Sequence, residues 1–158
     1  MGVVMTALRA NRTGRSTQKP ARSREQKIKG PPKGEPFVCL TLQLIESDAV
    51  RTLSNAETKI LFRLIAEHMK HAGRDNGRLP CTYDDFVRYG VRRKSIRPAL
   101  ESLEKRGLIR RVRKGHLVPG REGGAPSLFL LTFLPHNISG DWQVATGDWK
   151  RYLANAKK

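Results

Sequence analysis

The sequence is poor in cysteine and in long apolar runs, and each shortage excludes a class of protein. Among 158 residues there are only two cysteines, Cys39 and Cys81, and neither belongs to a CxxC pair. We therefore expect two half-buried thiols in a reducing cytosol, not a disulfide framework or a zinc site. No run of about 20 apolar residues exists, so no membrane-spanning helix is expected. The first residues lack a basic start followed by a long apolar region, which argues against a secretory signal.

Signatures of catalysis and of metal binding are also missing. The glycine-rich stretch GREGGAPS lacks the lysine of a phosphate loop, and no HExxH occurs. His68 and His71 have no third ligand nearby, so we expect surface groups. Asp84 and Asp85 are adjacent and would point to different faces of a helix, as first-turn charges do. We expect no enzyme, no metal site, no cofactor and no small-molecule substrate.

Acidic residues are scarce, and the basic excess is concentrated in two places. There are 31 Lys and Arg against 14 Asp and Glu, a net charge of +17. Residues 1–35 carry +7, residues 36–91 carry zero, residues 92–121 carry +9 and residues 122–158 carry +1. This charge favours a polyanionic partner, with nucleic acid first and an anionic membrane surface second. Even then we expect a cytoplasmic, nucleoid-associated protein with no membrane contact.

The first basic segment, residues 1–35, is rich in Arg, Lys, Ser, Gly and Pro and has almost no large apolar residue after Leu8. It cannot bury enough surface to offset its chain entropy, so disorder is predicted. Two interpretations remain open: a solvated linker, or a basic arm that lies along phosphates or in a minor groove.

Apolar periodicity and capping residues predict three helices. The first, at about 55–71, opens with the capping-box pair Ser54 and Glu57. The second, at about 83–89, has Thr82 as its N-cap and ends at Gly90. The third spans about 93–105 and is closed by Gly107.

Proline at position 98 leaves the start of the third helix undecided. If the helix begins at Arg93, Pro98 removes a backbone donor and crowds the carbonyl of Lys94. If Ser95 is the N-cap, Pro98 falls in the first turn and costs little.

Strand patterns surround these helices. Alternating Val38, Leu40, Leu42 and Leu44 predict a strand, or else an extended segment packed on a helix. SDAVRTL predicts a single helical turn, and LPCT a very short strand. LIRRVRKG and LFLLTFL predict two strands joined by a Gly/Pro loop. On the first of these, Arg111 and Arg113 should share one face and Arg110 the other.

The segment GVRRKSIRPALESLEKRGLIRRVRKG resembles the recognition helix and first wing strand of winged helix-turn-helix DNA-binding proteins. The resemblance covers about residues 54–133 and is closest to replication-initiator and regulator types of plasmids and phages. It implies an α+β winged helix-turn-helix with three helices and a two-stranded β-hairpin wing. Residues 1–35 would be the disordered arm, residues 36–134 the winged domain, and residues 135–158 an extension with a short helix.

This fold implies that the third helix reads the major groove of double-stranded DNA while the wing meets the backbone. A transcriptional regulator is the first hypothesis, and a plasmid or phage replication initiator or accessory protein is the alternative. RNA binding is a second alternative, although the aromatic residues are expected mostly in the core. The candidate DNA-binding residues are Arg92, Arg93, Lys94, Ser95, Arg97, Arg110, Arg111, Arg113, Lys114, His116 and Arg121.

The end of the chain repeats Gly-Asp-Trp at 140–142 and 147–149. Asp148 is a candidate cap for a last helix containing Trp149, Tyr152 and Leu153. This helix would pack on the domain or mediate contact with a partner, and a homodimer reading two half-sites stays open.

Overall fold

The computed structural model describes residues 34–116, 125–138 and 140–152. Contacts divide the chain after Glu35, so the unit described below begins at Pro36. The predicted arm lies outside the described residues, except for Gly34 and Glu35. The predicted wing-loop contact Arg121 also lies outside them.

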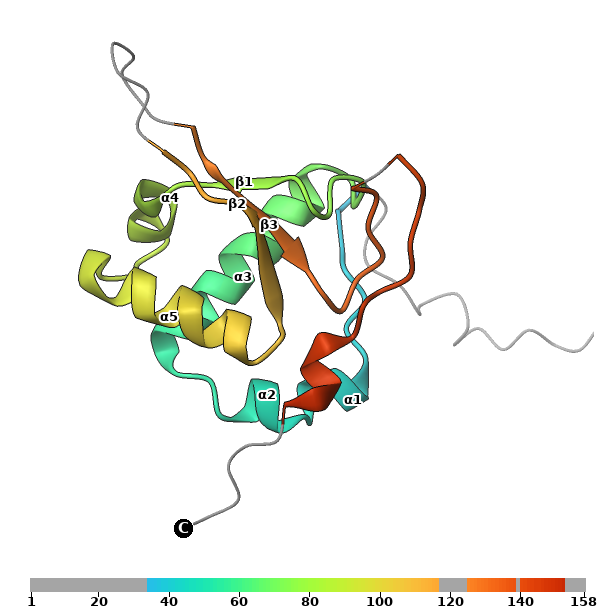
Figure 1. The fold of residues 1–158 in the computed structure, drawn as a ribbon, viewed down its shortest axis with the longest axis horizontal. Coiled ribbons are helices and arrows are strands. Elements are labelled where there is room, and N and C mark those ends of the chain that lie inside the picture. Colours follow the sequence, from blue (N-terminus) through green and yellow to red (C-terminus); the bar gives the residue numbers. More distant parts are fainter. Residues whose placement is uncertain (1–33, 117–124, 139, 153–158) are drawn as a thin grey trace, which may run out of the picture. The chain divides into compact units, whose positions relative to one another are not determined.

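The folded unit is α+β. Its described residues form five α-helices, a three-stranded antiparallel sheet and a final 3-10 turn (Figure 1). The elements in chain order are α1 (Leu42–Ile45), α2 (Asp48–Arg51), α3 (Asn55–Lys70), β1 (Leu79–Cys81), α4 (Tyr83–Arg88), α5 (Arg93–Lys105), β2 (Ile109–Arg113), β3 (Ser127–Leu131) and η2 (Asp148–Arg151).

The three predicted helices are confirmed as α3, α4 and α5. Ser54 and Glu57 form the expected capping box: the Glu57 carboxylate accepts from the Ser54 N–H, and the Ser54 hydroxyl accepts from the Glu57 N–H. Thr82 and Asp85 form a second capping box that opens α4. These boxes fix where α3 and α4 begin, because each satisfies backbone donors that a helix leaves unpaired.

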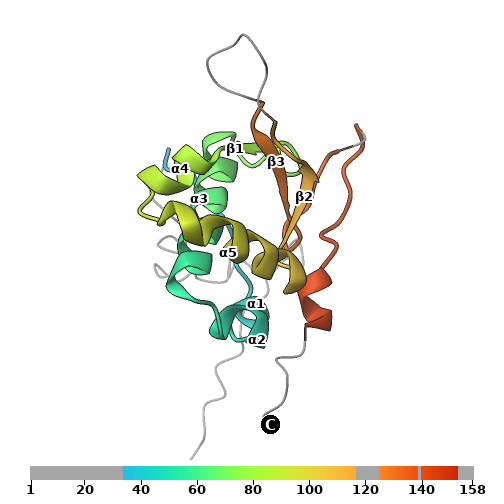
Figure 2. The ribbon, with the colours of Figure 1, turned by 60° about the vertical axis from the view of Figure 1, so that its left-hand side comes forward.

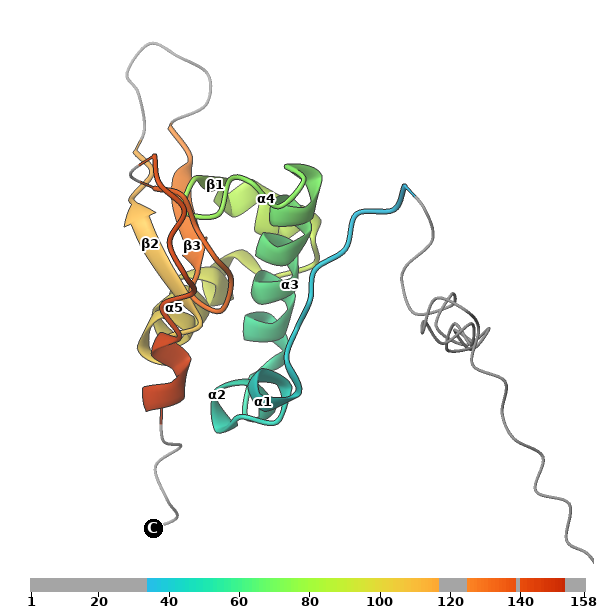
Figure 3. The same cartoon turned by 90° about the vertical axis from the view of Figure 1, so that its right-hand side faces the viewer.

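The predicted strand over 38–44 does not form. Thr41 caps the short helix α1 instead, its hydroxyl accepting from the Leu44 N–H at 3.3 Å. Before it, residues 36–41 run without regular structure beside α3 (Figure 3). Val38 and Leu40 are partly buried against the core, as the packed-segment interpretation requires. Apolar residues spaced two apart can pack on a helix from an irregular segment as well as from a strand. The Thr41 cap, which starts α1, therefore decides that this segment is not a strand.

The sheet has three strands, not the two expected for the hairpin alone. β3 lies at the centre, with β1 and β2 antiparallel on either side of it. Asn76, fully buried before β1, holds β3 in place. Its side-chain amide donates to the carbonyls of Leu131, Leu134 and Pro135 at 2.9–3.1 Å, and its oxygen accepts from the Leu131 N–H at 2.8 Å. One buried side chain thus replaces the ladder at the end of β3.

The core lies between α3, α5 and the inner face of the sheet. It is one cluster whose largest fully buried members are Phe86, Phe129, Ile60, Leu64, Leu79, Ile96, Leu100, Leu103, Leu108 and Leu131. The predicted stripe on the third helix is confirmed, since Ile96, Ala99, Leu100 and Leu103 are all buried.

Arg106, immediately after α5, is 9% exposed and links four parts of the chain. Its guanidinium donates to the Ala49 carbonyl at 3.2 Å and to the Thr52 hydroxyl and carbonyl at 2.6 and 2.9 Å. Its Nε lies 3.5 Å from the Glu57 carboxylate, and its Cζ lies 5.0 Å from the centre of the Tyr152 ring. Burial alone would raise the pKa of Glu57. Hydrogen bonds from Ser102 and Ser54 and the charge of Arg106 outweigh this effect and lower the pKa below its ordinary value, so the carboxylate stays ionised.

The last described segment packs on this assembly. Trp149 is buried in the core cluster. Gly147, in a left-handed conformation, is the N-cap of η2. Asp148 therefore does not cap the turn as expected, and its carboxylate accepts from Arg110 instead. Gly107 has φ of +67°, and a Cβ there would lie 2.7 Å from the backbone carbon of Asp148. Only glycine allows η2 to approach so closely.

Replacing Arg106 by methionine is expected to destabilise the domain by roughly 3–5 kcal/mol, because the buried Glu57 carboxylate loses its charged partner. The matched control is Arg110→Met, which breaks an exposed ion pair and should cost about 0–1 kcal/mol. Urea unfolding followed by circular dichroism measures both. Equal losses in the two variants would contradict the central role of Arg106.

Candidate nucleic-acid interface

Most of the residues predicted to bind nucleic acid lie on α5 and β2, which are neighbours in the fold (Figure 2); Arg92 precedes α5, and Lys114 and His116 follow β2. The apolar stripe of α5 faces the core, so its other side is exposed and carries Arg93, Lys94, Arg97 and Pro98. Arg97 is the most open of the paired arginines, with 78% of its side chain exposed. The helix thus presents a basic, uncovered face.

α5 begins at Arg93, which decides between the two starts that the sequence left open. Arg92 occupies the N-cap position without a side-chain cap, and the half-buried Ser95 is inside the first turn. Pro98 is therefore inside the helix, where it cannot donate to the Lys94 carbonyl. Because Pro98 is exposed, that carbonyl can be hydrated, and the helix continues to Lys105.

Two arginines of α5 already have carboxylate partners. Arg93 donates to Asp84 of α4, and the Nε of Arg97 donates to Glu101 at 3.0 Å. The hydrogen bond from Arg97 lowers the pKa of Glu101. Each pair restrains an otherwise flexible guanidinium, while its exposure leaves the positive group accessible to a competing anion.

On β2, a bulge changes which arginines share a face. Arg111 lies opposite Phe129, whereas Arg113 lies opposite Leu128, so one extra residue stands between them. Directly opposed residues point to the same side of a sheet. The expectation that Arg111 and Arg113 share a face is therefore wrong, because the bulge at Val112 reverses the alternation.

The two arginines at the start of β2 make different contacts. Arg111 is 16% exposed, donates to Glu104 at 3.2 Å and lies with its Cζ 6.0 Å from the centre of the Phe129 ring. Arg110 is on the opposite face and donates to Asp148 at 2.8 Å. Arg111 thus ties β2 to α5, and Arg110 ties β2 to η2.

The remaining cations are exposed, and within the described part of the chain they have no ion-pair partner. They are Arg92 and Lys94 at the beginning of α5, and Arg113 and Lys114 at the end of β2. His116 is also exposed and forms a β-bridge with Ala125. Among the candidate residues that the structure describes, uncompensated positive charge is therefore found at two places: around the paired Arg93 at the beginning of α5, and at the end of β2.

The acidic partners of these arginines were not anticipated as part of the site. Glu101 follows Arg97 by four residues, a spacing that predicts a helical ion pair. Asp84 and Asp148 are nine and 38 positions from their partners, so only the tertiary structure brings them together.

Among the described residues, Tyr83, Tyr89 and Trp142 are exposed, as are Phe37 and Phe62, so the expectation that the aromatic residues lie mostly in the core holds only in part. Tyr83 is at the start of α4, Tyr89 at its end, and Trp142 in the segment after β3. The tryptophans of the two Gly-Asp-Trp repeats differ, since Trp149 is buried and Trp142 is 57% exposed.

Titratable groups outside this interface do not gather into a metal site in the described part of the chain. The described residues contain no group of three His, Cys, Asp or Glu side chains that could hold a metal ion. His68 is buried, unlike the surface group expected, and burial lowers its pKa. Cys39 is exposed and Cys81 buried, and both are free thiols; burial raises the pKa of Cys81 to about 12.

No helix in the described ranges is long and apolar enough to cross a membrane. Comparisons with protein-family models, with curated proteins and with solved structures give no match.

Asp85 fixes the beginning of α4, which in turn positions α5. Burial raises the pKa of Asp85, but hydrogen bonds from Thr82 and Arg88 and the charge of Arg63 outweigh it and lower the pKa to about 2, from 3.8. A carboxyl whose pKa falls on folding stabilises the folded state above its unfolded pKa. That stabilisation is lost as the pH falls from about 4 to about 2.

We expect Asp85→Asn to lower stability at pH 7 by about 2 kcal/mol and to flatten the loss of stability between pH 4 and pH 2. The matched control is Asp84→Asn, on the same turn but exposed, which should keep the acid-dependent loss. Urea unfolding at several pH values gives the comparison. An unchanged pH profile in Asp85→Asn would show that another carboxyl is responsible.

Proposed function

We propose that this protein binds double-stranded DNA in a sequence-specific way, as a transcriptional regulator with a winged helix-turn-helix domain. The observation that carries the proposal is the exposed, basic face of α5, continued by the unpaired cations at the end of β2. The +9 net charge of residues 92–121 coincides with these two elements.

The order of the elements supports the winged-helix assignment. A long helix, a short strand, a short helix, a second long helix and a hairpin follow one another from α3 to β3. The turn from α4 to α5 is short and contains Gly90 at φ of +86°. In such a motif the second helix enters the major groove, with the residues near its N-terminus closest to the bases.

The contacts of the candidate residues suggest that they bind different parts of the DNA. Arg93 and Arg97 are held by carboxylates, and each would exchange its carboxylate for a base edge or a phosphate. Arg92, Lys94, Arg113 and Lys114 have no such partner among the described residues and suit phosphates. Arg111 is largely committed to Glu104, so we assign it a positioning role rather than a DNA contact.

The exposed aromatic side chains favour a second candidate, single-stranded nucleic acid such as RNA. Tyr83, Tyr89 and Trp142 could stack on unpaired bases. Initiation of plasmid or phage replication remains the alternative role for a duplex-binding protein, and it requires the same interface.

Binding to duplex DNA should weaken steeply with salt. If about five phosphates are neutralised, the logarithm of the affinity should fall against the logarithm of the salt concentration with a slope of about −4 to −5. Fluorescence anisotropy with a labelled duplex, and with the corresponding single strand and RNA hairpin as competitors, measures this. A flat salt response, or tighter binding of the single-stranded competitors, would overturn the duplex proposal.

Arg97→Ala should lower affinity for a selected DNA site by about 10- to 100-fold and affinity for a scrambled duplex much less, because a base contact is lost. Arg113→Ala should weaken both duplexes similarly, as expected for a phosphate contact. Arg51→Ala on α2 removes the same charge away from the interface and is the control. If Arg97→Ala keeps the specificity ratio of the parent, α5 does not read bases through this residue.

A further inference from the structure

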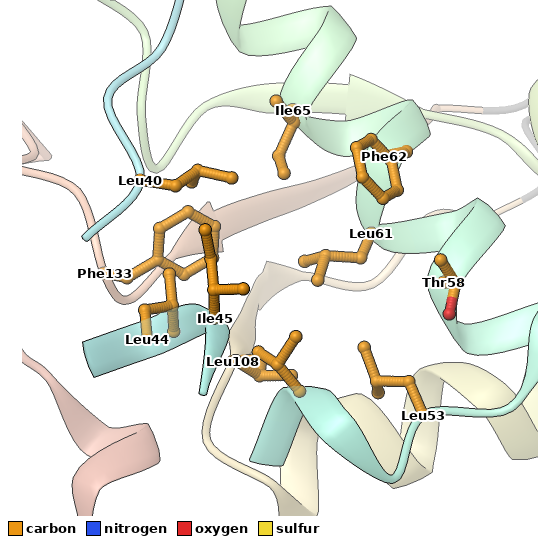
Figure 4. Close-up of a pocket in the computed structure, with 11 residues that line it drawn as sticks. Leu40, Leu44, Ile45, Leu53, Thr58, Leu61, Phe62, Ile65, Leu108 and Phe133 are labelled. Atoms are coloured by element: carbon orange, nitrogen blue, oxygen red, sulfur yellow. The ribbon is translucent and has the colours of Figure 1, made fainter. Parts of the chain in front are cut away.

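An apolar groove lies between α1, α2 and α3, and none of the basic residues of α5 and β2 is among its lining residues. It has a volume of about 250 Å³, and Leu40, Ile45, Leu61, Phe62, Leu108 and Phe133 are among its lining residues (Figure 4). The only polar side chain in the lining, Thr58, already donates its hydroxyl to the Ser54 carbonyl at 3.0 Å. A cavity of this chemistry holds water poorly and is stabilised by apolar atoms.

Large apolar side chains stand exposed at the edge of the groove. Phe62 is 51% exposed and Ile45 is 47% exposed, although both also line the cavity. The same surface therefore carries a hollow and the side chains that could fill such a hollow. A surface of this kind is self-complementary, which is the requirement of a two-fold interface, where one patch meets its own copy.

Charge also favours a second copy of this chain on this face. A chain with a net charge of +17 repels its own copies over most of its surface. The segment that builds most of the groove, residues 40–65, is neutral: it has three acidic residues (Glu46, Asp48 and Glu57) and three basic residues (Arg51, Lys59 and Arg63). An acidic protein partner would instead be drawn to the basic surface, and the groove offers it no charge.

We propose that the groove is a homodimer interface, in which Phe62 and Ile45 of each copy enter the groove of the other. None of the residues assigned to DNA lines the groove, so a contact centred on it does not require any of them. This inference does not depend on DNA binding, and its test uses the protein without nucleic acid.

Sedimentation equilibrium of the full chain, over about 1–100 µM and at high salt to screen repulsion, should show a reversible monomer–dimer equilibrium. Phe62→Glu and Ile45→Glu should each raise the dimer dissociation constant at least 10-fold, because a carboxylate would be buried without a partner. The matched control is Val144→Glu, at an apolar position that is 85% exposed and outside the groove, which should dimerise like the parent.

Hydrogen exchange of the unmodified chain provides a measurement that does not rely on the variants. Amides of α1 and α3 should become more protected at high than at low protein concentration, and those of the exposed face of α5 should not. A parent chain that stays monomeric at about 100 µM overturns the proposal, since a standard interface supports association in this range. So does a dimer that Phe62→Glu and Ile45→Glu leave intact, or concentration-dependent protection confined to other elements.

Discussion

The buried guanidinium of Arg106 connects the parts of the domain that the sheet does not reach. It follows α5 directly, binds the linker between α2 and α3, and faces the carboxylate that caps α3. A buried charge is tolerated only when all its hydrogen bonds are made and an opposite charge lies nearby. The groups that contact Arg106 are therefore each held in one position. Through these contacts α3 and α5 are fixed at their ends as well as along the core. The orientation of the basic face of α5 therefore depends on a residue that does not belong to that face.

Among the described residues, some basic side chains of α5 and β2 are held in ion pairs, and others are free to bind a ligand. Acidic partners on α4, on α5 itself and on η2 hold three of the basic side chains, while others have no partner in the described structure. A polyanion that binds this surface, as we propose, would contact the unpaired cations directly. To bind the paired arginines it would first have to displace their carboxylates. The carboxylates thereby reduce non-specific attraction relative to what the basic residues alone would give, and a ligand that matches the guanidinium geometry is favoured.

The sequence predicted the elements that local chemistry controls. Some features could be predicted because the residues that form them lie within a few positions of one another. They are the capping boxes at Ser54 and Thr82, the buried stripe of Ile96, Leu100 and Leu103, and the glycines that end the helices. Residues 38–44 left two interpretations open, because alternation of apolar residues does not distinguish a strand from an irregular packed segment; the strand is wrong, and the packed segment holds for Val38 and Leu40. The bulge at Val112 was not predictable, since it is defined by the pairing of β2 with a strand more than ten residues away. The role of Asn76 in holding β3 was not predicted, because its partners are more than 50 positions away in the sequence. For the candidate site, the sequence alone shows where the basic residues are concentrated. It does not show which of them are paired, because Asp84 and Asp148 are distant in sequence from their partners.

The close approach of η2 to Gly107 bears on the order in which a growing chain completes its structure. Every group that the Arg106 guanidinium hydrogen-bonds lies earlier in the chain, so this network can close as soon as α5 has emerged from the ribosome. Trp149 and Tyr152 come later in the chain than these groups and cover the same region. A nascent chain that stops short of η2 would hold its arginine network while leaving apolar surface uncovered at Gly107. Docking of η2 and protection of the core from premature association therefore coincide.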